Sequence, residues 1–307
     1  MAADVTVSIV NHESRDAVLD SLRALLADEG RAARLQVIVV DNVSRDGSVP
    51  AIRAAYPEVE VIERGERAGY GANHNLALAR AEGRHVLFLN DDARVRPGAV
   101  DALAAYLDAH REVAAAAPTL VHADGTPQAS LWPTPSVRRE VLAAARLGRG
   151  RPAALDGRRP QPVGWAMGCA LLVRRDAARA VGGFDERFFM YAEEMDLLVR
   201  LARQQGPTYW VPDAEVVHEG QASTGDSPER AVEMARSRRL YQERHFSPTG
   251  RSVARAAQCV QFALLALQAR LRGRPARPFW LQAVGAWREP GPPGLRERAE
   301  AFNQRRR

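Results

Sequence analysis

The sequence predicts an α/β protein with a mostly parallel central sheet, flanking helices and a helical extension at its C-terminal end. Three observations support this prediction. Short apolar, often β-branched runs recur along the chain, segments with helical spacing of apolar residues separate them, and polar or glycine-rich turns follow several runs. Strands that alternate with helices roughly every 20 to 30 residues are typical of βαβ units, whose strands pair in parallel.

The first half of the chain contains four predicted strands with helices between them. The strands lie at 5–10, 35–40, 59–62 and 86–89. The first helix lies at 16–27, the second ends near residue 55, and the third ends near residue 81. The run 86–89 has four consecutive apolar residues, which are too few for an ordinary helix. It therefore predicts a strand buried on both faces.

The second half is less regular. We expect a helix at 98–109, a strand at 113–121 with a hairpin turn at Asp124-Gly125, and a Pro-, Arg- and Gly-rich insertion or mobile loop at 133–162. Order resumes at 163–173, and a helix at 176–181 ends at Gly182-Gly183. An acidic helix start near Glu193 and two short strands, 209–211 and 215–217, complete the predicted sheet region.

Composition and charge narrow the function classes. The chain has 307 residues with 46% hydrophobic and 26% charged residues, which is typical of a soluble globular protein. Two distant cysteines predict neither a disulfide framework nor a zinc site, and Asp4 interrupts any signal peptide. No apolar run is long enough to span a membrane. We therefore expect a cytoplasmic protein.

The net charge of +6 is unevenly distributed, because residues 246–307 carry +9 and the rest of the chain carries −3. Such a basic tail suits nucleic acid or an anionic membrane surface equally on charge alone, and it also suits a merely solvated end.

Polar residues follow three predicted strands, at Asn11, at Asp41 and at Asn90-Asp91-Asp92. In an open α/β sheet, ligands bind at the carboxyl ends of the parallel strands. Adjacent carboxylates repel each other unless a cation lies between them, and Mg²⁺ or Mn²⁺ suits oxygen ligands and phosphates. The alternative is a solvated Asn-Asp-Asp turn.

Two further features of this edge suit a nucleotide. Asp41 can accept hydrogen bonds from a ribose hydroxyl or a base imino group, or it can form an Asx-turn. Gly69 and Gly71 allow close backbone approach or positive φ, but their spacing fits neither a P-loop nor a dinucleotide fingerprint.

Glu193, Glu194 and Asp196 open an apolar-periodic helix. They either complement the helix dipole or supply a general base that deprotonates an acceptor hydroxyl. His218 follows a predicted strand. It is either a structural histidine or the nitrogen ligand of a mostly oxygen metal site.

These motifs, in this order, resemble glycosyltransferase family 2 of the GT-A fold, a Rossmann-like architecture. They resemble most the rhamnosyltransferase-like branch that builds bacterial cell-envelope polysaccharides. The resemblance covers about residues 4 to 245 and rests on five segments: 7–14, 41–48, 69–75, 89–92 and 183–197. It implies a domain at 1–245, with a nucleotide-sugar-binding half at about 1–125, an acceptor-binding half at 126–245, and a separate basic helical tail at 246–307.

The resemblance also implies residue roles. The donor site would contain Asn11, Asp41, Gly69, Asn75, Asn90 and Asp91. Asp92 and His218 would bind a divalent cation, Mg²⁺ or Mn²⁺, and Trp165, Glu193 and Asp196 are candidate acceptor contacts. Glu194 stands where the family usually has the Asp of a Glu-Asp pair, so the base is Glu194 or, failing that, Glu193 or Asp196. Asp91 stands where proline is common, and it would assist the metal or contact the donor sugar.

The tail predicts one amphipathic helix at 251–272. Its apolar stripe consists of Val253, Val260, Leu264, Leu267 and Leu271, and we expect Arg251, Arg255, Gln258, Gln268 and Arg272 on the other side. The helix would lie on an anionic lipid surface, making the protein peripheral on the inner face of the cell membrane, or it would pack onto the domain or a dimer partner. From Pro290 onward we expect a disordered end.

The resulting function is that of a metal-dependent, inverting glycosyltransferase. It would use a nucleotide sugar such as dTDP-rhamnose and extend a lipid-linked or polysaccharide acceptor. Alternatives are another sugar, such as galactofuranose or N-acetylglucosamine, or a non-catalytic nucleotide-sugar-binding protein if Glu194 fails as a base. We expect no nucleic-acid partner, because no DNA-reading motif or aromatic-interleaved basic surface supports one.

Overall fold

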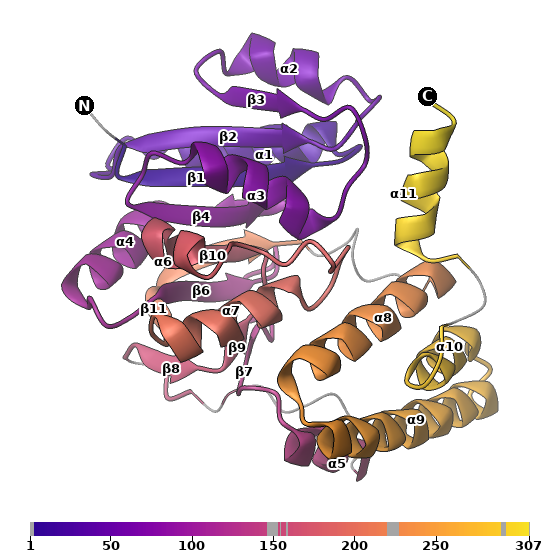
Figure 1. Ribbon diagram of the computed structural model, residues 1–307. Helices are drawn as coiled ribbons and strands as arrows, with labels where there is room; N and C mark the ends of the chain where they lie inside the picture. Colours follow the sequence, from indigo (N-terminus) through magenta and orange to yellow (C-terminus); the bar gives the residue numbers. More distant parts are fainter. Residues whose placement is uncertain are drawn as a thin grey trace. The chain divides into compact units, whose positions relative to one another are not determined.

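The computed structural model describes residues 3–145, 153, 155–157, 159–219, 227–289 and 293–306 (Figure 1). The chain forms two compact units. The first comprises Met1–Pro133, Pro152–Asp185 and Glu194–Gln221, and the second comprises Thr134–Arg151, Glu186–Glu193 and Ala222–Arg307. Helix α8 (Pro228–His245), which the sequence analysis placed with the sheet, therefore groups with the tail helices.

The first unit contains the central sheet, and its elements follow the predicted alternation closely. The strands are β1 (Val5–Asn11), β2 (Leu35–Asp41), β3 (Glu60–Glu63), β4 (His85–Asn90), β5 (Ala93–Val95), β6 (Ala115–Val121), β8 (Gln161–Val163), β10 (Ala170–Arg174) and β11 (Thr208–His218). A second, two-stranded sheet pairs β7 (Leu131–Trp132) with β9 (Trp165–Ala166). The helices are α1 (Arg15–Leu26), α2 (Ser48–Ala55), α3 (Tyr70–Arg80), α4 (Ala99–Ala109), α6 (Arg175–Ala180) and α7 (Glu193–Gln204).

The strand order is β3-β2-β1-β4-β10-β6-β11-β5, with β8 paired to β11. Pairing is parallel from β3 to β4, but β10 inserts antiparallel between β4 and β6. The prediction of a mostly parallel sheet is therefore right for the first half, and the sheet as a whole is mixed. The physical reason is that an antiparallel neighbour needs no helical crossover, so the sequence between β6 and β10 is free of the βαβ pattern.

Strand β11 replaces the two short strands that we predicted. Its pairing with β6 shifts register between Trp210 and Glu215, and Pro212, which lacks a backbone N–H, lies inside this irregularity. The apolar pattern breaks there, but the strand continues to His218.

Side-chain alternation along the strands divides the core into two layers. Leu87 and Leu89 of β4 face a cluster that includes α1, α2 and α4, whereas Val86 and Phe88 face a cluster that includes α3, α6 and α7. Figure 1 shows α3, α6 and α7 in front of the sheet. The run 86–89 is fully buried on both faces, as predicted.

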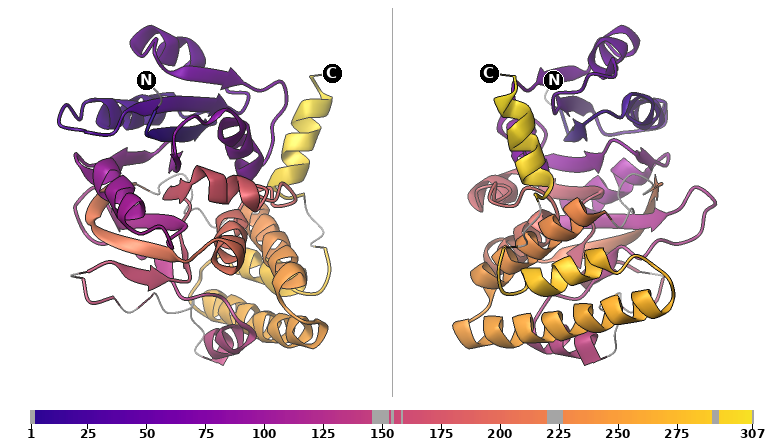
Figure 2. Two further views of the ribbon diagram at one scale, coloured as in Figure 1. Left: turned by 60° about the vertical axis from the view of Figure 1, so that its left-hand side comes forward. Right: turned by 90° about the vertical axis from the view of Figure 1, so that its right-hand side faces the viewer.

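The second unit is helical. It contains α5 (Val137–Ala145), α8, α9 (Pro248–Leu271), α10 (Arg277–Gly285) and α11 (Leu295–Gln304). Helix α10 packs against α8 and α9, which Figure 2 shows from two further sides. The predicted tail helix is confirmed as α9. The end that we expected to be disordered contains α11. Of the predicted insertion at 133–162, residues 146–152 lie outside the described residues. No described helix is long and apolar enough to cross a membrane.

Candidate active site

The strand ends predicted to converge do converge. Asn11 lies opposite Asp41 across the β1–β2 pair, and Asn90 lies opposite Val10 across the β1–β4 pair. The side chains after three parallel strands therefore share one edge of the sheet, where α/β proteins bind ligands.

Asp41 and Asn11 form a buried pair at this edge. Asn11 Nδ2 donates to Asp41 Oδ1 at 2.8 Å, and the backbone N–H of Ser44 donates to Asp41 Oδ2 at 3.0 Å. Each carboxylate oxygen keeps one further lone pair, and Asn11 Oδ1 is buried without a hydrogen-bond partner. Asp41 thus holds the turn after β2 through the N–H of Ser44, three residues on, and a donor contact for Asp41 stays a prediction.

The loop after β2 is held in an unusual backbone conformation. The Asn42 side chain accepts from Ala68 N at 2.9 Å and donates to Ala68 O at 3.1 Å, which ties this loop to the segment before α3. Val43 and Glu13 both have positive φ, at 64° and 53°. A β-branched residue rarely adopts this conformation, and such strain concentrates at ligand sites. The sequence analysis did not single out Asn42.

Helix α3 packs against Phe184 of segment 183–197, the segment that resembles the family's acceptor motif. Asn75 Nδ2 donates to Phe184 O and Asn75 Oδ1 accepts from Phe184 N, both at 2.9 Å. A Cβ at Gly71 would lie 2.7 Å from Phe184 Cβ, so Gly71 serves close packing here. Gly69 is the N-cap of the helix. Asn75 thus positions the acceptor motif in this structure, and donor contacts for Asn75 and Gly69 stay predictions.

Asp92 and His218 meet because β5 pairs antiparallel with the end of β11. In that register His218 lies opposite Ala93, the residue after Asp92. Asp92 Oδ1 and His218 Nε2 are 3.4 Å apart, and both atoms are buried without a hydrogen-bond partner. Burial alone would raise the pKa of Asp92, but the His218 side chain outweighs it and holds that pKa below its ordinary value.

Gln128 fixes the orientation of the His218 ring. His218 Nδ1 lies 3.0 Å from Gln128 Oε1, an oxygen that can only accept, so Nδ1 carries the proton. Nε2 faces Asp92, and whenever it is not protonated its lone pair can bind a cation. Such an acceptor behind a histidine is the usual support of a metal ligand. The sequence gives no indication of this role for Gln128, because no motif surrounds residue 128.

These two facing atoms fit a divalent cation. A carboxylate oxygen and an imidazole nitrogen are suitable ligands, and Mg²⁺ in phosphate-transfer sites is typically held by one or two side chains together with substrate phosphates. The described residues contain no group of three or more His, Cys, Asp or Glu that could hold a metal alone. The donor set is thus compatible with a cation that shares its shell with a bound ligand.

Asn90 ends strand β4, and Asp91 lies between it and Asp92. The Tyr70 hydroxyl lies 2.7 Å from Asn90 Oδ1 and 3.0 Å from the Gly168 carbonyl oxygen. Burial and, next, the charge of Asp92 raise the pKa of Asp91 to about 7. Asn90 and Asp91 directly precede Asp92 in the chain, and their contacts with a donor stay predictions.

Glu194 approaches the same corner from α7. Its side chain lies against Gly168, where an added Cβ would be 3.1 Å from Glu194 Cβ. The next residue, Cys169, has a raised pKa because of burial and because of the charges of Asp92 and Glu194. Since Cys169 O also accepts from Asn90 N at 2.9 Å, the segment 168–169 connects Glu194 to the end of β4.

The Glu194 carboxyl group has a pKa close to neutral pH. Burial raises its pKa to about 7. A carboxylate with this pKa is both substantially deprotonated at neutral pH and basic enough to take a proton from a hydroxyl in a transition state. The two residues before Glu193, Tyr191 and Ala192, have positive φ of 69° and 64°, so the backbone leading into α7 is strained as well.

The two alternatives for the base differ from Glu194. Asp196 is 0% exposed and pairs with Arg200 Nε at 2.7 Å, while Arg200 also donates to the carbonyl oxygens of Val181 and Gly183. This placement argues against the acceptor role predicted for Asp196, because its carboxylate is enclosed and already paired. Glu193 is buried too, and its acceptor role stays a prediction.

Trp165 lies in β9 and stacks on Trp132 of β7, with ring centroids 4.3 Å apart and planes 15° apart. Both rings are half-buried. A stacked indole pair offers a flat apolar surface, so an acceptor contact for Trp165 stays a reasonable prediction; Trp132 was missed because a two-residue strand has no periodicity to read.

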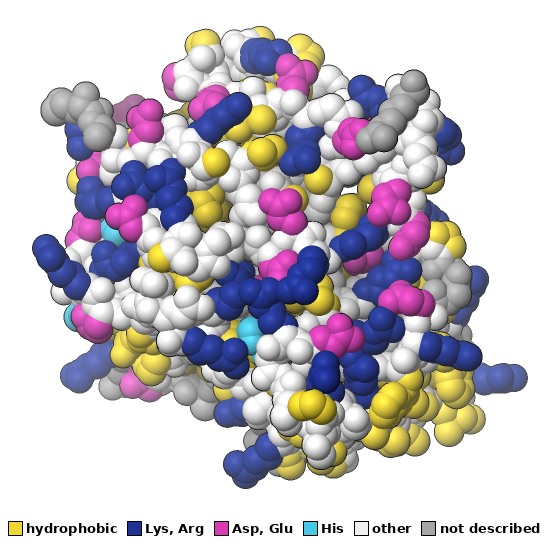
Figure 3. Space-filling view, viewed as in Figure 1, with side chains coloured by type: hydrophobic (Ala, Val, Ile, Leu, Met, Phe, Trp, Pro, Cys, Tyr) yellow, Lys and Arg dark blue, Asp and Glu magenta, His cyan; other side chains and the backbone are white. Residues whose placement is uncertain are grey.

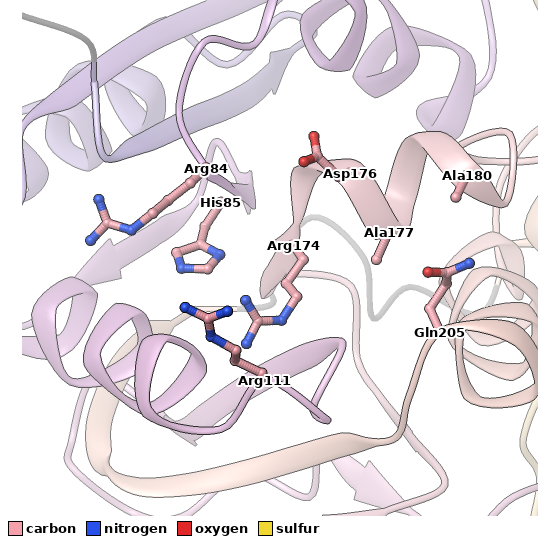
Figure 4. Close-up of a pocket in the computed structure, with 8 residues that line it drawn as sticks. All are labelled: Arg84, His85, Arg111, Arg174, Asp176, Ala177, Ala180 and Gln205. Atoms are coloured by element: carbon pink, nitrogen blue, oxygen red, sulfur yellow. The ribbon is translucent and has the colours of Figure 1, made fainter.

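A separate hollow of about 490 Å³ lies at the opposite edge of the sheet, where β4 begins and β10 ends (Figure 4). Its lining includes Arg84, His85, Arg111 and Arg174. Arg84 pairs with Asp4 and Asp108, and Arg174 donates to backbone carbonyl oxygens. Two of the three guanidinium groups are thus used within the fold, and the hollow is remote from the Asp92–His218 pair.

Comparison with known sequences decides the family. Residues 6–182 match the sequence model of the family described as Glycosyl transferase family 2. The chain belongs to this family. The match spans β1 to the turn after α6, and thus contains the Asp41, Asn90–Asp92 and Gly168 segments.

Relatives within the family include rhamnosyltransferases. The chain is 35% identical over 219 residues to N-acetylglucosaminyl-diphospho-decaprenol L-rhamnosyltransferase of Mycobacterium tuberculosis, covering 63% of this chain and 69% of the relative. It is 28% identical over 234 residues to rhamnosyltransferase WbbL of Escherichia coli, covering 70% and 83%.

Solved structures confirm the predicted GT-A fold. Mannosyltransferase PcManGT from Pyrobaculum calidifontis, in complex with GDP-Man and Mn²⁺, matches with a TM-score of 0.56 and 19% identity, covering 99% of this chain and 88% of that one. GalNAc-T7 with UDP, GalNAc and Mn²⁺ matches with a TM-score of 0.60 and 16% identity, covering 79% of this chain and half (50%) of that one.

Proposed function

We propose that this glycosyltransferase is a metal-dependent, inverting enzyme that moves rhamnose from dTDP-rhamnose to a hydroxyl of a lipid-linked or polysaccharide acceptor in cell-envelope glycan synthesis. One observation carries the proposal: two unbonded, buried ligand atoms, Asp92 Oδ1 and His218 Nε2, lie 3.4 Å apart in the same unit as a carboxylate whose pKa is about 7.

The donor would bind along the edge formed by β2, β1 and β4. Asn11 Oδ1, buried without a partner, is available to a donor N–H or O–H group, and Asp41 has lone pairs left for the ribose or base. Asn90 and Asp91 would lie at the diphosphate and sugar. Asp92 and His218 would hold Mg²⁺ or Mn²⁺, and the bound cation would neutralise charge that develops on the leaving diphosphate.

Glu194 would perform the proton transfer. As the acceptor oxygen bonds to the anomeric carbon, Glu194 takes the hydroxyl proton, and the bond between that carbon and the diphosphate oxygen breaks with its electron pair leaving on the nucleoside diphosphate. Attack opposite the leaving group inverts the anomeric carbon. One carboxylate suffices for this displacement, whereas a hydrolase needs a pair flanking the bond.

The relatives support rhamnose and a lipid-linked acceptor. Two of them are named rhamnosyltransferases, and the name of the mycobacterial protein includes a diphospho-decaprenol acceptor. A lipid-linked acceptor would keep the enzyme at the cytoplasmic face of a membrane. Transfer of galactofuranose or N-acetylglucosamine, or donor binding without transfer, are the alternatives.

A donor panel tests the proposal. Calorimetric binding of dTDP-rhamnose, UDP-N-acetylglucosamine, UDP-galactofuranose and GDP-mannose, with and without Mn²⁺, should give metal-dependent binding of dTDP-rhamnose alone. Transfer to a synthetic prenyl-diphospho-N-acetylglucosamine, followed by NMR of the new linkage, should show inversion. Glu194→Gln should keep donor binding and lose about 10²- to 10⁴-fold in kcat, whereas the exposed control Glu58→Gln should lose nothing.

Binding of a different donor would change the sugar but keep the transferase. Donor binding with no turnover in any acceptor assay, and no difference between wild type and Glu194→Gln, would favour the non-catalytic alternative. Absence of binding to every donor would overturn the proposal.

A further inference from the structure

Helix α9 exposes its stripe of large apolar side chains to solvent, unlike an ordinary surface helix. The prediction of one apolar stripe on this helix is confirmed, but the stripe faces outward. Its large members are exposed, Leu271 by 79% and Val260 by 56%, and they recur at spacings of three, four or seven residues, which place them on one face. The full stripe is Val253, Val260, Leu264, Leu267 and Leu271.

The inner side of α9 is partly polar. Gln258, which we predicted on the side opposite the stripe, is 1% exposed. Its Oε1 accepts from Gln242 of α8 at 3.2 Å, and its Nε2 lies 3.4 Å from the carbonyl oxygen of Gln282 in α10. An ordinary surface helix buries its leucines and exposes its glutamines. Here Phe262 and three alanines are buried beside Gln258 and Gln261, while the leucines of the stripe stay exposed, so the unit buries α9 without using the stripe.

The charge around the stripe has one sign. Residues 246–288 contain no Asp or Glu and seven Arg. Exposed arginines continue directly from the stripe at Arg270, Arg272, Arg274 and Arg277. Figure 3 shows hydrophobic side chains gathered at the lower right, where Figure 1 draws α9 and α10, with Lys or Arg side chains around them. The exposed Trp280 of α10 and Trp287 just after it add two amphipathic aromatic rings to this stretch.

We propose that the exposed face of α9, together with the arginines that follow it, binds an anionic lipid surface, with the leucine stripe in the acyl boundary and the arginines at the headgroups. The inference rests on the proposed function only for its purpose, which is to bring the enzyme to a lipid-linked acceptor. An outward apolar stripe within a sequence stretch that contains arginines and no Asp or Glu is the composition of an interfacial helix, although Arg255 of α9 pairs with Glu243 of α8.

A second copy of the chain is the competing occupant. The stripe also has the spacing of a helix–helix seam, but a symmetric pair would bring seven arginines of one copy near seven of the other, without a single carboxylate in this stretch to pair with them. Helix pairs are specified by opposite charges beside the seam. An anionic surface satisfies the same arginines.

Vesicle co-sedimentation of the full chain tests the proposal, with no donor or acceptor present. Wild type should bind vesicles of phosphatidylglycerol and phosphatidylcholine, and it should bind pure phosphatidylcholine far more weakly. Leu264→Asp/Leu267→Asp should lose binding to both. The control Leu76→Asp, at an exposed leucine of α3, should bind like wild type.

A charge variant separates the two contributions. Arg270→Glu/Arg272→Glu/Arg274→Glu should lower the partition coefficient on anionic vesicles at least about a hundredfold at low salt and leave the weak binding to neutral vesicles unchanged. Wild-type binding should also weaken as salt rises.

Three results would overturn the proposal. These are equal binding by wild type and the Leu264→Asp/Leu267→Asp variant, no preference for anionic lipid, or sedimentation of wild type as a dimer that this variant turns into a monomer. Calorimetric donor binding by each variant keeps the two proposals apart. Donor affinity should be unchanged in all of them. Loss of vesicle binding would therefore not contradict the proposed donor site, and loss of donor binding would not contradict the proposed lipid contact.

Discussion

Two buried acid–base pairs in the same unit show how a structural contact differs from a pair of candidate metal ligands. Asp196 and Arg200 lie 2.7 Å apart, and the guanidinium uses its other N–H groups on the carbonyl oxygens of Val181 and Gly183. Asp92 and His218 lie 3.4 Å apart, and the atoms that face each other have no hydrogen bond. Most buried polar groups in folded proteins have hydrogen-bond partners, so facing ligand atoms without one are candidates for binding a ligand, which we propose for Asp92 and His218.

The largest expected effect comes from the open pair. Asp92→Asn should lower kcat/KM by about 10³-fold or more, because it removes a charged ligand from the site of developing charge. Its free energy of unfolding should stay within about 1 kcal/mol of wild type, since asparagine keeps the size of the side chain and one acceptor oxygen. Steady-state kinetics and urea denaturation measure both quantities, with Asp213→Asn, an exposed residue of β11, as the control.

The closed pair should respond in the opposite way. Asp196→Ala leaves a buried guanidinium without its carboxylate, so unfolding should become about 3–5 kcal/mol easier. Arg200→Met in the same chain should recover part of that loss, because the uncompensated charge is then gone. A loss below about 1 kcal/mol in urea denaturation would show that this pair is not the structural contact described here.

A third test concerns Gln128, whose side chain contacts Nδ1 of His218. Gln128→Leu removes the acceptor for Nδ1–H and should weaken Mn²⁺ affinity about 10- to 100-fold. Gln128→Glu provides a stronger acceptor and should keep or improve that affinity. Calorimetric Mn²⁺ titration in the presence of donor tests both; equal weakening by the two substitutions would assign Gln128 to packing only.

The pKa of Glu194 sets the pH dependence. Only deprotonated Glu194 can accept the hydroxyl proton, so kcat should fall about tenfold per pH unit below the pKa of about 7 and level off above it. The residual activity of Glu194→Gln should lack this inflection. A wild-type profile that is flat from pH 5 to 8, with chemistry shown to be rate-limiting, would rule out Glu194 as the base.

The smallest expected effect concerns Gly168, which lies against the Glu194 side chain. A Cβ at Gly168 would lie 3.1 Å from Glu194 Cβ, so Gly168→Ala should displace the carboxylate by a few tenths of an ångström and lower kcat about three- to tenfold. Gly65→Ala, where an added Cβ has no neighbour within 4 Å, is the matched control. Equal kinetics for the two variants would show that the position of Glu194 is not critical.

Much of the fold and the row of strand-end residues could be predicted from the sequence. A run such as 86–89 has only one reasonable interpretation, and parallel strands bring Asn11, Asp41 and Asn90 to one edge whatever the loops do. The antiparallel β10 could not be predicted, because its apolar run has the same appearance in either direction.

The contacts that support the site residues could not be predicted from the sequence either. Asp196 and Glu194 are two residues apart and carry the same charge, and only the packing of α7 shows that one meets Arg200 and the other lies over Gly168. Gln128 contacts His218 across 90 residues of sequence, with no local pattern to mark it. The stripe of α9 could be found by periodicity, but periodicity does not say which side faces the solvent.

A double-mutant cycle on Mn²⁺ affinity tests the central claim most directly. Mn²⁺ binding with dTDP-rhamnose present would be measured by calorimetry or paramagnetic resonance for wild type, Asp92→Asn, His218→Ala and the double variant, with Asp196→Asn as a fifth protein. We predict that each single change weakens Mn²⁺ binding, that the double variant is scarcely weaker than the worse single variant, and that Asp196→Asn binds Mn²⁺ like wild type. Independent, additive losses at Asp92 and His218, or Mn²⁺ binding that neither change affects, would contradict the assignment of this open pair as the metal site.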